Sequence, residues 1–123
     1  GSTFGGNPFA SAVSVAAIDV VVEEGLAAQA MARGAYLKKE LEKIAACSRF
    51  IQEVRGRGLL LGLELAKDAP SSKEIMLALL DDGVIVNDTK PNVIRIAPPL
   101  NISRAETEWG LDKLYNVFVT AER

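Results

Sequence analysis

The chain begins with a segment that is apolar on every side of a helical repeat. Phe9–Val22 has this pattern, and it follows Asn7 and Pro8, which suit an N-cap and a first helical turn. We predict a helix over Pro8–Glu24 that ends at Gly25. A helix that is apolar all round is normally covered on several sides, and so short a chain contains little to cover it.

A second helix, with one apolar and one polar side, is predicted from Leu26 to Ala46. Its apolar residues recur every three or four positions, and lysines and glutamates occupy the opposite side. The predicted inner side consists of Ala30, Gly34, Leu37, Leu41 and Ile44. This pattern is typical of a surface helix that lies over a core.

Beyond Cys47 the apolar positions alternate, as they do in β-strands. Phe50–Val54 alternates, RGRG at 55–58 predicts a turn, and Leu59–Leu65 carries leucine at every odd position. The leucine face of the second strand is predicted to be buried. Gly62, in the middle of that strand, indicates a close approach to the backbone.

Two more strands and two more helices complete the pattern. The strands are predicted at 84–87 and 92–97, around a turn at 88–91. Each helix begins with the capping-box spacing, a serine followed three residues later by glutamate: Ser71 with Glu74, and Ser103 with Glu106. The residues predicted to be buried are Ile75, Met76, Leu79 and Leu80 in the first helix and Leu111, Leu114, Tyr115 and Phe118 in the last.

Strands and helices do not alternate regularly, which favours an α+β fold. We expect a small, mainly antiparallel sheet with helices on one face, preceded by a long linking helix. With 123 residues, 49% hydrophobic and 24% charged, the chain has the length and composition of one globular domain. Its net charge of −2 gives no general attraction to nucleic acid or to an anionic membrane, so neither is expected as a partner.

Two residue types exclude several classes of chemistry. The chain contains no histidine, which removes Ser-His and Cys-His catalysis and histidine-bearing metal sites, and no metal is expected. Cys47 is the single cysteine, so an internal disulfide is excluded and it is expected to be a small residue near a helix end. With no pattern of a bilayer span or of a signal peptide, a cytoplasmic location is expected.

The opening sequence GSTFGGNP has the composition of an anion-binding turn. Ser2 and Thr3 supply hydroxyl and backbone N–H donors, and Gly5 and Gly6 let the main chain approach a ligand without a Cβ clash. Its place before a helix N-terminus also favours an anion. Composition alone leaves open the alternative of a flexible start with no ligand.

Arg95 is the second candidate, because it lies between two isoleucines in a predicted strand. A buried guanidinium needs a carboxylate or phosphate partner, and its planar donors suit bidentate carboxylate binding. Glu64 could be an internal partner. The alternative is that Arg95 lies on the solvent-exposed face of a half-buried strand and binds no ligand. Arg55 and Arg57 are predicted as solvent-facing turn residues.

GSTFGGNP, VRGRGLLLGLEL, GVIVN and NVIRIAPPL occur in an order that resembles the C-terminal part of the class III (subgroup II) pyridoxal-phosphate aminotransferases. The resemblance covers nearly the whole chain and is nearest to the acetylornithine branch, with the ornithine branch next. It implies the C-terminal small domain of the fold-type I pyridoxal-phosphate-dependent transferases. Residues 1–24 would be an interface loop and linking helix from a large domain, and residues 25–123 the small domain.

The resemblance also implies a cofactor, a partner and three site residues. Thr3 would bind the phosphate of pyridoxal 5'-phosphate held by the other subunit of a homodimer, which forms through the N-terminal loop and linking helix. Ser2 would lie at the substrate, and Arg95 would meet a substrate carboxylate or a gating glutamate. The family's Schiff-base lysine, pyridine-binding aspartate and glycine-rich loop lie upstream, so no catalytic residue is expected here and the chain alone should be inactive.

The implied reaction is amino transfer from N-acetylornithine to 2-oxoglutarate, a step of arginine biosynthesis. One alternative is an ornithine, 4-aminobutyrate or other ω-amino-acid aminotransferase. A second alternative, of a different class, is a free-standing binding or dimerisation module that is not part of an enzyme.

Overall fold

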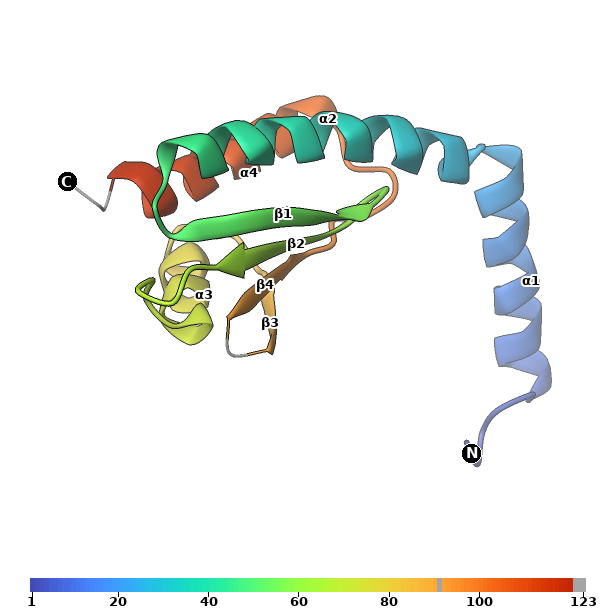
Figure 1. The fold of residues 1–123 in the computed structure, drawn as a ribbon. Helices are drawn as coiled ribbons and strands as arrows, with labels where there is room; N and C mark the ends of the chain where they lie inside the picture. The colour runs from blue at the N-terminus through green and yellow to red at the C-terminus, as the bar shows by residue number, and fades with distance from the viewer. Residues whose placement is uncertain (91, 121–123) are drawn as a thin grey trace.

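In the computed structural model, which describes residues 1–90 and 92–120, helices cover one face of a four-stranded antiparallel sheet (Figure 1). The elements in chain order are α1 (Pro8–Glu23), α2 (Leu26–Cys47), β1 (Ile51–Arg57), β2 (Leu60–Leu65), α3 (Ser72–Asp81), β3 (Asn87–Lys90), β4 (Val93–Ile96), α4 (Arg104–Tyr115) and a π-helical turn η1 (Asn116–Thr120). The predicted α+β class is confirmed.

The strand order is β1-β2-β4-β3, with every neighbouring pair antiparallel. The pairing places Arg55 opposite Gly62, Gly62 opposite Arg95, and Arg95 opposite Asn87. Directly opposed residues share a face of a sheet. These four residues therefore form one row across the sheet, on the face opposite the core.

The core lies between the sheet and its helices. Leu61 and Leu63 on β2 and Ile94 on β4 are at most 2% exposed, as the alternating pattern predicts. Figure 1 shows α2 and α4 lying over this face of the sheet, and α3 contacts β3 and β4 at one side. The largest side chains that are fully buried are Phe118, Leu41, Leu61, Leu63, Leu79 and Ile94.

Helix α2 packs against the β1–β2 turn with no space for a side chain at Gly34. A Cβ placed there would lie 2.1 Å from the carbonyl oxygen of Gly58, which is itself in the left-handed region at φ +55°. Gly62, where we expected a close backbone approach, has only ordinary contacts, the nearest being Val93 Cγ1 at 3.6 Å. No described residue approaches Gly62 closely, so that prediction is wrong for this chain, and the close backbone approach is found at Gly34.

Helix α1 begins at Pro8 as predicted, ends at Glu23, one residue before the predicted end, and buries none of its residues. The Asn7 side chain caps it, accepting from the Ala10 N–H at 2.9 Å, and Gly25 at φ +60° turns the chain into α2. Figure 1 shows α1 running away from the sheet. Its exposed apolar side chains include Phe9, Val13, Val15, Ile18 and Val22.

The bounds of two strands differ clearly from the prediction. Strand β1 continues through Arg55 and Arg57, because the turn is made by Gly58 and Leu59 rather than by residues 55–58. Strand β3 spans Asn87–Lys90 rather than residues 84–87, so residues 88–90, predicted as part of a turn, belong to the strand. The N–H of Val84 donates to the carbonyl of Leu79 at 2.8 Å, so this segment completes the end of α3 before the strand starts. Pro91, the last residue of the predicted turn, lies outside the described residues.

Both predicted capping boxes are present, at Ser71 with Glu74 and at Ser103 with Glu106. Two residues predicted to be buried are half exposed, Leu80 at 50% and Tyr115 at 42%. No helix within residues 1–90 and 92–120 is long and apolar enough to cross a membrane.

Candidate functional site

The opening stretch folds as two consecutive turns that lead into α1. The N–H of Gly5 donates to the carbonyl of Ser2 at 3.2 Å, and the N–H of Asn7 donates to the carbonyl of Phe4 at 3.3 Å. Gly6 lies in the left-handed region at φ +77°. The turns therefore depend on glycine at position 6, which explains part of the sequence pattern.

Ser2 and Thr3 are exposed, and their hydroxyls make no hydrogen bond within the part of the chain that the structure describes. The stretch contains no acidic residue. A Cβ added at Gly6 would meet nothing within 4 Å, so a ligand can approach the main chain there. Free hydroxyl donors on an open, uncharged turn before a helix N-terminus fit a phosphate group.

Arg95 lies on interior strand β4, on the open face of the sheet. When the Asn87 amide is oriented so that its nitrogen faces the Val86 carbonyl, the orientation that satisfies both of its polar atoms, Arg95 Nη2 donates to the Asn87 side-chain oxygen over 2.6 Å. Asn87 lies opposite Arg95 on β3. Glu64 does not pair with Arg95. It accepts instead from Arg55 Nη1, which also lies 3.2 Å from Glu53 Oε2. The predicted Glu64 partner is wrong: the register places Arg55 and Arg95 both opposite Gly62, diagonal to Glu64, and Glu64 pairs with Arg55.

A shallow depression of about 380 Å³ surrounds Arg95 on this face. Its lining residues are Arg55, Gly56, Arg57, Leu60, Leu61, Gly62, Thr89, Val93 and Arg95. Arg55 is compensated by two glutamates, whereas Arg57 and Arg95 make no ion pair among the described residues. The depression therefore offers uncompensated positive charge, and its chemistry suits a carboxylate.

The structure does not bring the two candidate sites together within one chain. Figure 1 shows the N-terminus at the far end of α1, which projects from the N-terminal end of α2, away from the sheet that lies along α2. Thr3 and Arg95 therefore cannot contact one small ligand in this arrangement.

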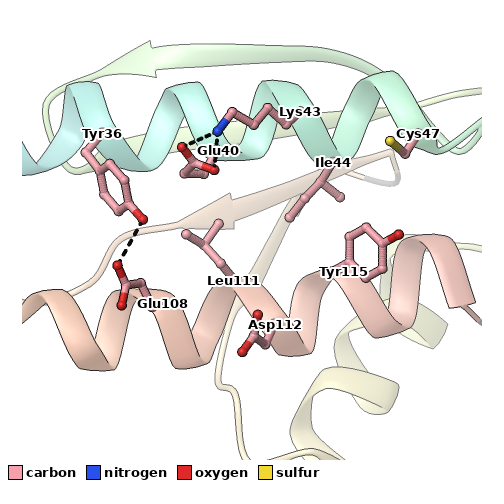
Figure 2. Close-up of a pocket in the computed structure, with 9 residues that line it drawn as sticks. All are labelled: Tyr36, Glu40, Lys43, Ile44, Cys47, Glu108, Leu111, Asp112 and Tyr115. Carbon is pink, nitrogen blue, oxygen red and sulfur yellow. Dashed lines mark hydrogen bonds and ion pairs between the residues drawn. The ribbon is translucent and has the colours of Figure 1, made fainter.

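A different groove, of about 310 Å³, lies between α2 and α4 (Figure 2). Most of its polar groups are engaged: Lys43 Nζ lies 2.7 Å from Glu40 Oε1, and Tyr36 OH donates to Glu108 at 3.3 Å. Cys47 lies exposed at the end of α2, at the rim of this groove, as expected for a small residue at a helix end. The groove is a seam between packed helices.

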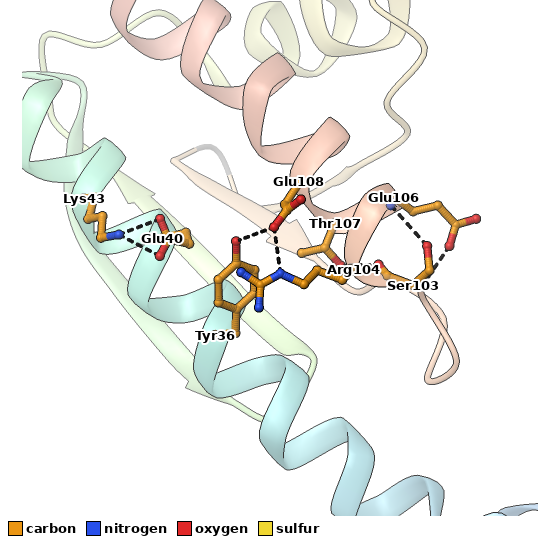
Figure 3. Close-up of polar contacts among 8 residues, drawn as sticks. All are labelled: Tyr36, Glu40, Lys43, Ser103, Arg104, Glu106, Thr107 and Glu108. Carbon is orange, nitrogen blue, oxygen red and sulfur yellow. Dashed lines mark hydrogen bonds and ion pairs between the residues drawn. The ribbon is translucent and has the colours of Figure 1, made fainter.

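The same seam is closed by a polar cluster that fastens α4 to α2 (Figure 3). The guanidinium of Arg104 lies 4.4 Å from the centre of the Tyr36 ring, and its Nε donates to Glu108 at 2.7 Å. This hydrogen bond raises the pKa of Arg104 and lowers the pKa of Glu108. Because Arg104 and Glu108 are four residues apart in a helix, their pairing could be predicted from the sequence. The contact of Arg104 with Tyr36 could not, because it depends on how the two helices pack.

Hydrogen bonds from the capping serines also shift two carboxyl groups. Ser71 lowers the pKa of Glu74, and Ser103 lowers the pKa of Glu106, each from an ordinary value of 4.5. These shifts arise from helix capping. Within residues 1–90 and 92–120 no group of acidic, cysteine or histidine side chains could hold a metal ion.

Comparisons with known proteins match the chain over nearly its whole length. The family model for "Aminotransferase class-III" matches residues 1–118. The ornithine aminotransferase of Staphylococcus epidermidis is 49% identical over 118 residues, which are 96% of this chain and 28% of that protein. The ornithine aminotransferase of Bacillus subtilis is 45% identical over 121 residues, 98% of this chain and 29% of that protein.

Solved structures agree with the fold. The acetylornithine aminotransferase from Elizabethkingia anophelis superposes with a TM-score of 0.88 at 37% identity, covering 96% of this chain and 30% of that one. The ornithine aminotransferase from Toxoplasma gondii ME49 gives a TM-score of 0.89 at 36% identity, covering 99% and 29%. The chain thus spans less than a third of the length of these relatives.

Proposed function

Because the chain belongs to the class III aminotransferase family, we propose that it is the C-terminal part of a pyridoxal-phosphate-dependent aminotransferase. The proposed reaction transfers the δ-amino group of N-acetylornithine to 2-oxoglutarate, a step of arginine biosynthesis in the cytoplasm. The observation that carries the proposal is the family match over residues 1–118, which includes Ser2, Thr3 and Arg95.

In this proposal the chain contributes binding groups and no catalytic residue. Pyridoxal 5'-phosphate, when bound, supplies the electron sink for amino transfer. Thr3 donates its hydroxyl to the phosphate of the cofactor in the partner subunit, Ser2 lies at the substrate, and Arg95 binds a substrate carboxylate in its own subunit. The free hydroxyls of Ser2 and Thr3 and the uncompensated charge of Arg95 support these roles.

We also propose that residues 1–24 are an interface loop and linking helix, and that residues 25–123 are the small domain. The hydrophobic core supports this division, because its buried members begin at Leu37 and include no residue of α1. Phe9 is 80% exposed and Val22 72% exposed, on a helix with no buried residue. Such a surface suits burial against a large domain and against the second subunit of a homodimer.

A second donor, ornithine, is favoured by one observation: the relatives at 45–49% identity are named ornithine aminotransferases. The full-length protein should therefore be assayed with 2-oxoglutarate and with N-acetylornithine, ornithine and 4-aminobutyrate in turn. The proposed function expects the highest kcat/KM with N-acetylornithine. A higher kcat/KM with ornithine assigns the second candidate, and no turnover with any donor contradicts both.

The proposed roles of Ser2 and Thr3 are tested by cofactor titration of the full-length protein. A hydrogen bond to a charged group is worth about 1.5–3 kcal/mol, so Thr3→Ala should weaken cofactor affinity by roughly 10- to 100-fold. Thr3→Ser, which keeps the hydroxyl, is the matched control and should stay close to the parent. Ser2→Ala should raise the KM for the amino donor and leave cofactor affinity nearly unchanged. Equal cofactor affinity in all four proteins would refute the role of Thr3.

The isolated 123-residue chain should show no transaminase turnover with added cofactor, because we propose that the catalytic lysine lies outside it. Measurable turnover by this chain alone would contradict that part of the proposal.

A further inference from the structure

Arg95 lies in the row formed by Arg55, Gly62, Arg95 and Asn87, and its neighbours on the two sides differ in chemistry. On one side, β2 presents Gly62, which has no side chain, and beyond it lies Arg55 on β1. On the other side, β3 presents Asn87. Arg55 is already engaged by Glu53 and Glu64, so it neither competes with Arg95 for a ligand nor holds it in place.

Asn87 is the polar partner of Arg95 within the described residues. Its side-chain oxygen accepts from Arg95 Nη2 at 2.6 Å, and its side-chain nitrogen donates to the carbonyl of Val86 at 3.3 Å. The opposite amide orientation would place two donors together and two acceptors together. The backbone contact at Val86 therefore orients the Asn87 amide, and the amide in turn holds one end of the guanidinium.

We propose that Asn87 is a positioning residue that holds the Arg95 guanidinium ready for a substrate carboxylate. This inference rests on the proposed function, in which Arg95 binds that carboxylate.

Two properties of the Arg95 side chain matter for this role, its conformational freedom and its charge. A free arginine side chain has many conformations, and fixing one of them on binding weakens affinity. One hydrogen bond to Asn87 reduces that loss and leaves the other N–H groups of the guanidinium for the ligand. The gap at Gly62 leaves room for the ligand on the opposite side of Arg95.

An amide suits this role better than a carboxylate would. The Asn87 oxygen accepts a hydrogen bond and carries no net charge, so Arg95 keeps its full attraction for a substrate anion. An aspartate at the same position would pair with Arg95 and compete with the substrate. Asn87→Ala and Asn87→Asp therefore have distinct expected effects.

The test is calorimetric binding of glutarate, a dicarboxylate that cannot be transaminated, to the full-length protein. Asn87→Ala should raise the Kd about three- to tenfold, because the variant loses all or part of the energy of one hydrogen bond to a charged group. Asn87→Asp should raise it further. Asn92→Ala is the matched control and should not change the Kd, since Asn92 is an exposed asparagine in the same hairpin whose side chain makes no hydrogen bond among the described residues.

Steady-state kinetics and a double variant complete the test. Asn87→Ala should raise the KM for 2-oxoglutarate by the same factor and leave kcat within about twofold, because binding and not chemistry is affected. In an Arg95→Lys background, Asn87→Ala should add nothing, because the residue acts through Arg95. An undiminished effect in that background would overturn the inference.

The failure of this inference differs from the failure of the proposed function. If Arg95→Lys weakens glutarate binding and Asn87→Ala does not, Asn87 is not a positioning residue and the role of Arg95 stands. If Arg95→Lys also leaves binding unchanged, the carboxylate site itself is wrong. An Asn87→Asp variant that binds glutarate as tightly as the parent would refute the charge argument.

Discussion

Replacing Gly34 by alanine should separate α2 from the sheet it covers. The added Cβ would lie 2.1 Å from the oxygen and 2.2 Å from the carbonyl carbon of Gly58. Both are backbone atoms of a tight turn and cannot rotate away as a flexible side chain would. To reach an ordinary contact of 3.4 Å, helix and turn must move apart by 1.3 Å, the difference between 3.4 and 2.1 Å.

Two opposing effects determine the size of the change. Alanine is favoured over glycine inside a helix by about 1 kcal/mol, which stabilises the variant. Overpacking a close contact costs about 1–3 kcal/mol, and a gap of up to 1 Å at neighbouring contacts loses a quarter to a half of their dispersion energy. Leu37 and Leu41, the next inward residues of α2, would lose contacts in this way. We expect a net loss of about 2 kcal/mol.

The assay is urea unfolding of the 123-residue chain followed by circular dichroism. Gly110→Ala is the matched control, because Gly110 lies within α4 and a Cβ there meets nothing within 4 Å. It should stabilise the chain by about 0.5–1 kcal/mol, so the two substitutions have opposite signs. A Gly34→Ala chain as stable as the parent or more stable would refute the packing argument.

Two further outcomes are expected in unfolding experiments. Phe118→Ala, at a fully buried side chain, should destabilise the chain by about 3–5 kcal/mol in the same urea assay, and a loss below 1 kcal/mol would contradict its place in the core. Ser71 and Ser103 lower the pKa values of Glu74 and Glu106 below 4.5, so this stabilisation is complete above pH 4.5 and is lost as the pH falls through the folded-state pKa. A chain carrying Glu74→Gln and Glu106→Gln should lose less stability than the parent on acidification. The same pH dependence in both chains would contradict this contribution of the two carboxylates.

The sequence predicted the starts of α1, α3 and α4 because each start has local chemistry. Asn7 before Pro8, and Ser71 three residues before Glu74, satisfy backbone donors within one turn of chain, so they act without knowledge of the rest of the fold. The start of β3 is different. The apolar run Val84–Val86 predicted a strand, but Val84 donates its N–H to the Leu79 carbonyl and so ends a helix instead of joining the sheet. This ending is a local one, made at Gly83 with φ +85°, whereas the pairing that forms β3 from Asn87 onward depends on β4.

The candidate site was also predictable only in part from the sequence. Arg95 was recognisable because a charged residue between two isoleucines is unusual in an apolar strand. Its neighbours were not, since the sequence left the strand order open. The order β1-β2-β4-β3 brings Asn87 beside Arg95 and Arg55 beside Glu64, whereas local sequence favoured Glu64 for Arg95 and a turn for Arg55.

The separation of Thr3 from Arg95 can be tested directly if, as proposed, they serve different subunits of a homodimer. Consider a full-length hybrid dimer with Thr3→Ala in one subunit and Arg95→Lys in the other. If Thr3 acts across the interface and Arg95 within its own subunit, one site receives both changes and the other receives neither. The hybrid should then retain about half of the parental activity, although each variant homodimer is impaired at both of its sites. If both residues served their own subunit, each site of the hybrid would carry one change and both would be impaired. Activity no higher than the mean of the two variant homodimers would therefore refute the cross-subunit role of Thr3, whatever the amino donor.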